Sequence, residues 1–133
     1  MIVDASVWVS VLVGHDVNHT ISRAWLHARL AAHDVLAVPT LFLPEVAVAI
    51  ARRRGISELG RQAVGQILLT PGLRLVSLDT ELSAEAARLA ADLQLKGADA
   101  VYVATARTLS LPLVTWDQEL HSKASRLVKV LHP

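Results

Sequence analysis

Four acidic residues, Asp4, Glu45, Asp99 and Asp117, lie where a carboxylate is unusual for the surrounding sequence. Asp4 and Asp117 each follow a short apolar run of the kind that forms a buried strand. Asp99 lies at the start of a strongly apolar segment that is typical of a helix. In open α/β sheets, ligands bind at the carboxyl ends of the strands. We therefore expect these three carboxylates to open onto one edge of a sheet.

Glu45 has the weakest structural explanation of the four. It lies between Leu41–Leu43 and Val46–Ile50, where nearly every helical face is apolar. A carboxylate in such surroundings needs a cation, a hydrogen-bond partner or a shifted pKa. Taken singly, Asp4 and Asp99 are better explained by a helix cap and by the helix dipole. The combination of the four acids favours a functional site.

The chemistry that fits such a group is metal binding. Two carboxylates about 4 Å apart repel each other by roughly 4 kcal/mol at an effective dielectric constant near 20, so the group must share protons or hold a cation. A set of oxygen ligands without cysteine suits Mg²⁺, with Mn²⁺ as a substitute, rather than zinc. Mg²⁺ keeps several waters and binds phosphate, which is the arrangement for metal-assisted phosphodiester hydrolysis.

Composition sets wider bounds on the protein. The 133 residues are enough for one domain with a substantial core. The mean hydropathy is +0.42, yet no apolar run approaches the roughly 18 residues of a membrane span, and we expect no signal peptide. The absence of cysteine fits a cytoplasmic protein. With 13 basic and 12 acidic residues, nucleic acid could be bound only through a local patch.

The apolar pattern predicts an α/β fold in which strands and helices alternate. Parallel strands covered on both faces are expected from this alternation. Thr40 is a plausible cap for the Glu45 helix, which we expect to be buried and to end at Gly55. Gly97 is expected to break the preceding helix. The predicted strands are 1–3, 35–38, 73–78, 111–115 and 127–131, and the predicted helices 8–13, 21–33, 41–55, 57–69, 80–95, 98–109 and 117–123.

Four short motifs carry the acidic residues: "VDAS" with Asp4, "PEV" with Glu45, "GADAVYVATA" with Asp99 and "TWDQEL" with Asp117. Their order and spacing, together with the chain length, resemble the VapC toxins among the PIN-domain ribonucleases. The resemblance covers the whole chain. It implies that Asp4, Glu45 and Asp99 are the main metal-binding and catalytic acids and that Asp117 is the fourth. It also matches Ser6 and Thr115 to the hydroxyl residues beside the first and last acids.

The resemblance further implies a single PIN domain over residues 1–133, with a central parallel sheet of about five strands flanked by helices. The activity that it implies is that of a Mg²⁺-dependent endoribonuclease, the toxin of a type II toxin–antitoxin pair. The expected partners are RNA, a second copy of the chain, and a cognate antitoxin whose C-terminal segment blocks the site in a hetero-oligomer. Trp116 is a bulky residue in the variable position of the last motif and could alter substrate access.

Other polar residues are weaker candidates. Lys96, three residues before Asp99, is the best candidate for a phosphate contact. The basic triplet Arg52–Arg54 is expected from the helix dipole alone. His15 and His19 fall in a polar stretch that we expect to be a loop, where solvent or substrate contacts are favoured over metal binding.

Two other functions compete with the nuclease. A phosphoacceptor receiver domain is rejected, because Asp4 has no acidic neighbour and no lysine follows the strand at 113–115. A PIN-like module that binds RNA or protein without catalysis remains the alternative.

Overall fold

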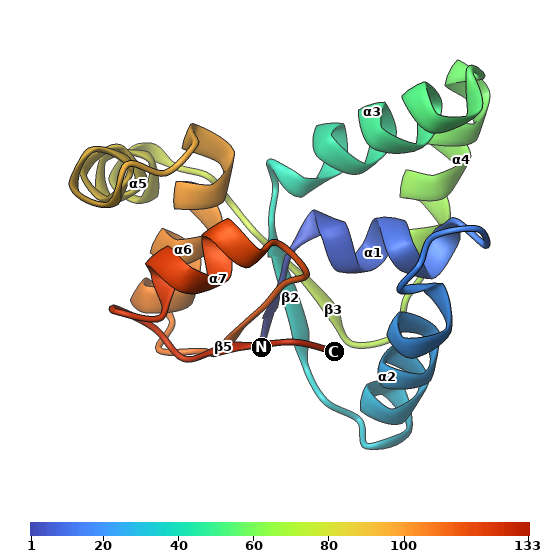
Figure 1. The fold of residues 1–133 in the computed structure, drawn as a ribbon, viewed down its shortest axis with the longest axis horizontal. Helices are drawn as coiled ribbons and strands as arrows, with labels where there is room; N and C mark the ends of the chain where they lie inside the picture. The colour runs from blue at the N-terminus through green and yellow to red at the C-terminus, as the bar shows by residue number, and fades with distance from the viewer.

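Strands and helices alternate along the whole chain, as the sequence predicts (Figure 1). The computed structural model describes all 133 residues. The strands are β1 (Ile2–Val3), β2 (Leu36–Pro39), β3 (Leu73–Val76), β4 (Leu113–Val114) and β5 (Val130–Leu131). The helices are α1 (Ala5–Leu12), α2 (His19–Ala31), α3 (Phe42–Arg54), α4 (Ser57–Leu68), α5 (Thr80–Leu93), α6 (Gly97–Thr108) and α7 (Gln118–Ala124).

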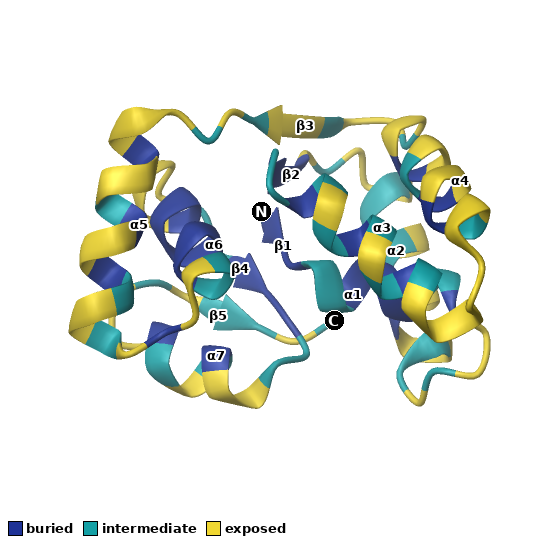
Figure 2. Ribbon diagram, turned by 90° about the horizontal axis from the view of Figure 1, so that it is seen from above, coloured by how far each residue is buried: buried dark blue, intermediate teal, exposed yellow.

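The five strands form one parallel sheet in the order β3-β2-β1-β4-β5, which confirms the predicted α/β class. The chain starts at the central strand, builds one half of the sheet with β2 and β3, and then returns to place β4 and β5 on the other side. Helices α1 to α4 lie on one side of the sheet, and α5 to α7 lie on the other (Figures 1 and 2). The change of direction between β1 and β4 is a topological switch point, where such sheets place their ligands.

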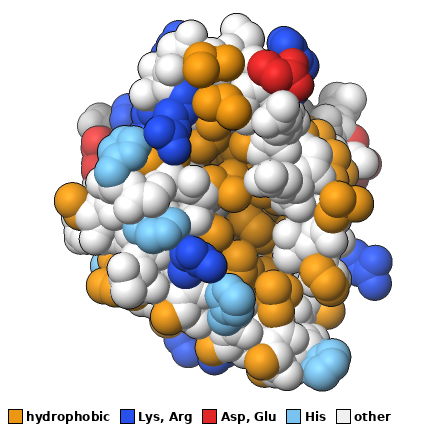
Figure 3. Space-filling view, turned by 90° about the vertical axis from the view of Figure 1, so that its right-hand side faces the viewer, with side chains coloured by type: hydrophobic (Ala, Val, Ile, Leu, Met, Phe, Trp, Pro, Cys, Tyr) orange, Lys and Arg blue, Asp and Glu red, His pale blue; other side chains and the backbone are white.

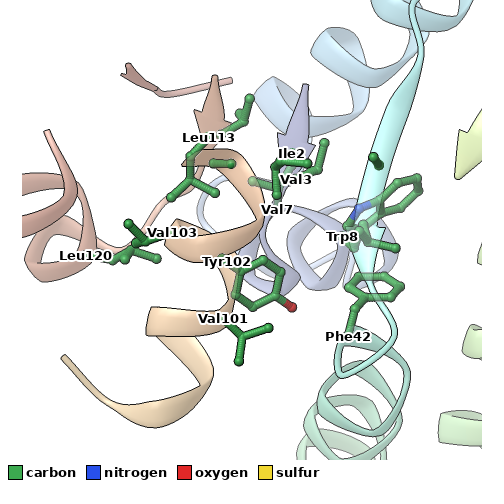
Figure 4. Packing of buried hydrophobic residues seen from close by; sticks show 14 of the residues in the cluster. Ile2, Val3, Val7, Trp8, Phe42, Val101, Tyr102, Val103, Leu113 and Leu120 are labelled. Carbon is green, nitrogen blue, oxygen red and sulfur yellow. The ribbon is translucent and has the colours of Figure 1, made fainter. Parts of the chain in front are cut away.

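The centre of the sheet is buried because both of its faces are covered. Strands β1, β2 and β4 are buried along their length, whereas the edge strand β3 is largely exposed (Figure 2). Continuous apolar strands of this kind are typical of parallel sheets. Helix α6 contacts β1, β2 and β4, and side chains of α6 and α1 meet in the core (Figure 4). The rigid core therefore fixes the start of α6, where Asp99 lies.

Helices α3 and α4 form a closely packed pair. Gly60 of α4 faces the backbone of α3, and a Cβ atom at this position would lie 2.3 Å from the carbonyl oxygen of Ala47. Only glycine allows this approach. Gly55 ends α3 with a φ of 68°, as predicted. The expectation that α3 is buried throughout is wrong: one stripe of apolar side chains is buried, while Val48 on another face is 43% exposed.

Two local predictions are also wrong. Thr40 does not cap α3, because its hydroxyl accepts a hydrogen bond from the N–H of Leu78 at 3.1 Å. Gly97 does not break α5, which ends earlier at Leu93 and is capped by Gln94 in a left-handed conformation, and Gly97 instead begins α6. None of the helices is both long and apolar enough to span a lipid bilayer.

Candidate active site

Asp4 lies at the centre of the site, directly after β1. Its backbone N–H donates to the carbonyl of Val114 at 2.9 Å, so it continues the pairing of β1 with β4. Its carboxylate caps α1 and accepts hydrogen bonds from the Ser6 hydroxyl at 2.5 Å and the Thr115 hydroxyl at 2.8 Å. Burial raises the pKa of Asp4, although these hydrogen bonds act in the opposite direction. The capping role considered from the sequence is therefore real, and two hydroxyl groups hold the carboxylate in addition.

Asp117 and Asp99 flank this centre. Asp117 follows β4 and caps α7 by accepting a hydrogen bond from the N–H of Leu120 at 2.8 Å. Asp99 lies in the first turn of α6. Burial raises the pKa of Asp99 to about 6, and the negative charges of Asp117 and Asp4 act in the same direction against the opposing charge of Lys96. Asp99 therefore lies within electrostatic range of both other aspartates.

Glu45 is half-buried in the first turn of α3 and takes part in none of the ion pairs. Its carboxylate accepts a hydrogen bond from the Tyr102 hydroxyl at 2.6 Å. Burial raises the pKa of Glu45; the Tyr102 hydrogen bond opposes this rise, and the charges of Asp4 and Asp99 add to it. The sequence-based argument that Glu45 needs a partner or a shifted pKa is confirmed on both counts.

The four predicted acids thus share one electrostatic environment, but they do not form a ready-made metal cage. No three acidic or histidine side chains stand close enough together to enclose a metal ion. Asp4, Glu45 and Asp117 are instead each held by a hydrogen-bond donor of the protein. The donor set of carboxylate oxygens fits Mg²⁺ or Mn²⁺ in its chemistry. The side chains would have to turn toward one another to share a cation.

Two residues of this region were missed in the sequence. Tyr102 is 1% exposed, and burial together with the charges of Asp4 and Glu45 raises its pKa, so the phenol stays protonated and donates to Glu45. Figure 4 shows its hydroxyl pointing toward the side of the core where α3 lies. Its position three residues after Asp99, on the same helical face, was an available signal. Glu119 was also missed, and its charge raises the pKa of Asp99.

The structure also places the basic and histidine residues that the sequence analysis singled out. Lys96 is exposed, immediately before α6, and near enough to Asp99 to lower its pKa. Arg53 forms an ion pair with Asp16 at 2.8 Å, in line with a structural role for the basic triplet. His19 does not lie in a loop: it begins α2, and its ring Nδ1 donates to the carbonyl of Ser10 at 2.8 Å.

Comparison with known proteins defines the class. The family model of the PIN domain matches residues 1–126, so the chain belongs to the PIN-domain family. No curated protein sequence matches the chain significantly.

Several solved structures share the fold. VapC20 of Mycobacterium tuberculosis, described as a Sarcin-Ricin loop cleaving toxin, has a TM-score of 0.74 and 20% identity over 91% of this chain and 92% of its own. FitAcB of Neisseria gonorrhoeae has a TM-score of 0.73 and 19% identity, covering 98% of this chain and 95% of its own. VapBC2 of Rickettsia felis, solved with promoter DNA, has a TM-score of 0.71 and 13% identity, covering 99% and 97%. At these identities the comparison establishes a common fold.

The raised pKa of Asp99 predicts a pH-dependent stability. The folded-state pKa of about 6 exceeds the ordinary value of 3.8, so the folded protein binds the Asp99 proton more tightly than the unfolded chain does. The resulting contribution to the free energy of unfolding is fully present below pH 3.8 and is lost as the pH rises through 6. In metal-free buffer, Asp99→Asn should remove this loss, which we expect to be about 1 kcal/mol after solvent screening. Melting curves across this pH range test the prediction. The matched control is Glu81→Gln, an exposed acid in the first turn of α5, which should keep the parent's profile. Parallel profiles for parent and Asp99→Asn would contradict the prediction.

Proposed function

We propose that this protein is a Mg²⁺-dependent endoribonuclease that acts as the toxin of a type II toxin–antitoxin pair. The observation that carries the proposal is the match of the PIN-domain family over residues 1–126, with Asp4 and Asp117 at the β1/β4 switch point and Asp99 within range of both, so that their charges add to the rise of its pKa. Such perturbed carboxylates are typical of functional sites. The reaction would take place in the cytoplasm, with RNA as the substrate.

The residues have distinct proposed roles. Asp4, Glu45 and Asp99 would hold the cation, with Asp117 as the fourth ligand, and Mn²⁺ could replace Mg²⁺. A bound divalent cation would polarise the scissile phosphate and make an attacking water more acidic. Ser6 and Thr115 orient the Asp4 carboxylate through their hydroxyls, and Tyr102 does the same for Glu45. Lys96 would contact a phosphate of the RNA.

An antitoxin partner is part of the proposal. Similar folds were solved as a toxin–antitoxin complex from Klebsiella pneumoniae and as FitAB bound to a DNA fragment. Figure 3 shows a hollow lined by hydrophobic side chains on the face formed around α1, α2 and α4, with basic and histidine side chains beside it. A cavity between α1, α3 and α4 is lined in part by Leu12, Ile50 and Leu59. An exposed apolar surface of this kind suits a protein partner, and a second copy of the chain is the other proposed partner.

One observation favours the alternative of an RNA- or protein-binding module without catalysis. The acids do not converge into a metal-ligating group as the side chains stand. Cleavage and binding assays on the same preparation separate the two functions.

Metal dependence is the decisive test of the nuclease. We expect purified protein to cleave single-stranded RNA with Mg²⁺ or Mn²⁺, to lose activity in excess EDTA, and to recover it when Mg²⁺ is restored, because the metal supplies several kcal/mol of transition-state stabilisation. Gel analysis of labelled RNA provides the measurement. Asp99→Asn, purified identically, controls for contaminating nucleases. Full activity in EDTA would reject the metal, while RNA binding without cleavage in Mg²⁺ would support the binding module.

A further inference from the structure

Three aromatic rings form a stack beside the acidic site. The Trp116 indole and the His132 imidazole have centroids 5.7 Å apart and planes within 13° of parallel. His132 in turn stacks on His121, with centroids 4.5 Å apart and an interplanar angle of 19°. Trp116 lies in the connection between β4 and α7, His121 lies on α7, and His132 follows β5, so three separate segments contribute to the stack.

Hydrogen bonds fix two of the rings. The indole Nε1 of Trp116 donates to the hydroxyl of Ser22 at 2.8 Å, and Ser22 is a fully buried residue of α2. The Nδ1 of His132 donates to the carbonyl of Thr115 at 2.8 Å. A ring held in this way loses little further freedom when another ring packs on it, and such preorganisation favours binding.

The stack adjoins the acids through the backbone. Trp116 lies between Thr115, whose hydroxyl donates to Asp4, and Asp117. The backbone N–H of Trp116 also donates to the Ser6 hydroxyl at 3.1 Å, and that hydroxyl donates to Asp4. The backbone at the start of the stack therefore contacts the residues that hold Asp4.

The charge around the stack favours nucleic acid as its ligand. Residues 120–133, which carry two of the three rings, contain no acidic residue. Lys96, exposed immediately before α6, forms no ion pair and lies within electrostatic range of Asp99 and of Glu119 on α7, the helix that carries His121. Aromatic rings combined with a basic side chain of this kind are the arrangement that binds single-stranded nucleic acid through its bases and phosphates.

We propose that Trp116, His132 and His121 form a platform on which a base of the RNA stacks, next to the phosphate to be cleaved. This inference rests on the proposed function for its substrate. It assigns a substrate-binding role to Trp116 that goes beyond its bulk in the last motif. His132 is the middle ring of the stack, so a base would pack on the outer face of Trp116 or of His121, which are both half-buried.

The test measures base-dependent binding without cleavage. A short oligoadenylate and an abasic strand of the same length are titrated in EDTA against the parent, the double variant His121→Ala/His132→Ala, and His132→Phe. The parent should bind oligoadenylate about tenfold more tightly than the abasic strand, as expected for one stacked base. The double variant should lose most of this preference, whereas His132→Phe should keep it because a ring remains. His27→Ala, an exposed histidine on α2, is the matched control and should behave like the parent.

A parallel assay in Mg²⁺ separates this proposal from the nuclease. The double variant should raise KM about tenfold with little change in kcat, since the rings bind substrate rather than the metal. An unchanged preference for oligoadenylate in the double variant, or loss of the preference in His132→Phe together with a lower Tm, would overturn the platform in favour of simple anchoring of the C-terminus. Base-dependent binding by a parent that cleaves no RNA would reject the nuclease and retain the platform. A parent that binds neither strand would reject the platform whatever its activity.

Discussion

Asp4→Asn is expected to reduce RNA cleavage by about a hundredfold or more while the protein stays folded. The loss follows from removing a charge that would hold the cation, an effect worth several kcal/mol. The fold should survive because the asparagine side-chain oxygen can still cap α1 and accept hydrogen bonds from Ser6 and Thr115. Since burial raises the pKa of Asp4, its ionised form is disfavoured in the folded state, and the neutral amide should equal or exceed the parent in Tm at neutral pH without metal.

The comparison with Asp4→Ala separates chemistry from folding. Alanine removes the cap, at a cost of about 1 kcal/mol, and leaves the Ser6 and Thr115 hydroxyls without their acceptor. Both variants should lack activity, but only the alanine variant should melt below the parent. Cleavage assays and melting curves on the same samples provide the readout. An Asp4→Asn protein that retains most of its activity would remove Asp4 from the metal site and leave it with the capping role alone.

Substitutions at Glu45 should also abolish cleavage, but their effects on stability depend on Tyr102. Glu45→Gln keeps an acceptor for the Tyr102 hydroxyl, which donates to Glu45 at 2.6 Å. Glu45→Leu leaves that buried hydroxyl unpaired, at a cost of about 1–3 kcal/mol. We therefore expect the glutamine variant to melt above the leucine variant, with both losing about a hundredfold in activity.

A double-mutant cycle tests the physical reason. Adding Tyr102→Phe to Glu45→Leu removes the unpaired hydroxyl and should restore most of the lost stability without restoring cleavage. Calorimetry of the metal-free proteins measures the interaction between the two sites. Additive effects of the two substitutions on the free energy of unfolding would show that the hydrogen bond contributes nothing. A stable and fully active Glu45→Leu protein would exclude Glu45 from the site.

The sequence was sufficient for the architecture because its apolar periodicity is strong. The central strands are continuous apolar runs, and Gly55 ends α3 where its chemistry predicts. The error at Thr40 arose because its side chain found a partner distant in sequence. Thr40 is adjacent to the helix that it was expected to cap, but its hydroxyl bonds to Leu78, on the segment after β3. Local pattern alone contains no information on such a contact.

As with the fold, part of the candidate site could be predicted from the sequence. The acids were identifiable because carboxylates in apolar surroundings are costly, and the switch point explains why Asp4 and Asp117 lie at the same edge of the sheet. Tyr102 was overlooked because an aromatic side chain in an apolar helix is ordinarily a packing residue, and its spacing from Asp99 was the one signal against that reading. The link between Trp116 and buried Ser22 was also invisible, because it joins segments 94 residues apart. Such pairings depend on how α2 and the end of β4 lie in space.

The central position of β1 has a consequence for biosynthesis. Its strand is made first, but one of its two neighbours, β4, lies more than a hundred residues later, with Ile2 paired to Leu113. Contacts of this range form slowly, because a long loop must close before they contribute. A chain still being translated lacks both β4 and Asp117, so it carries only part of the acidic site. Under the proposed function, the growing polypeptide would therefore be unable to cleave the messenger that encodes it until its last strands have been made.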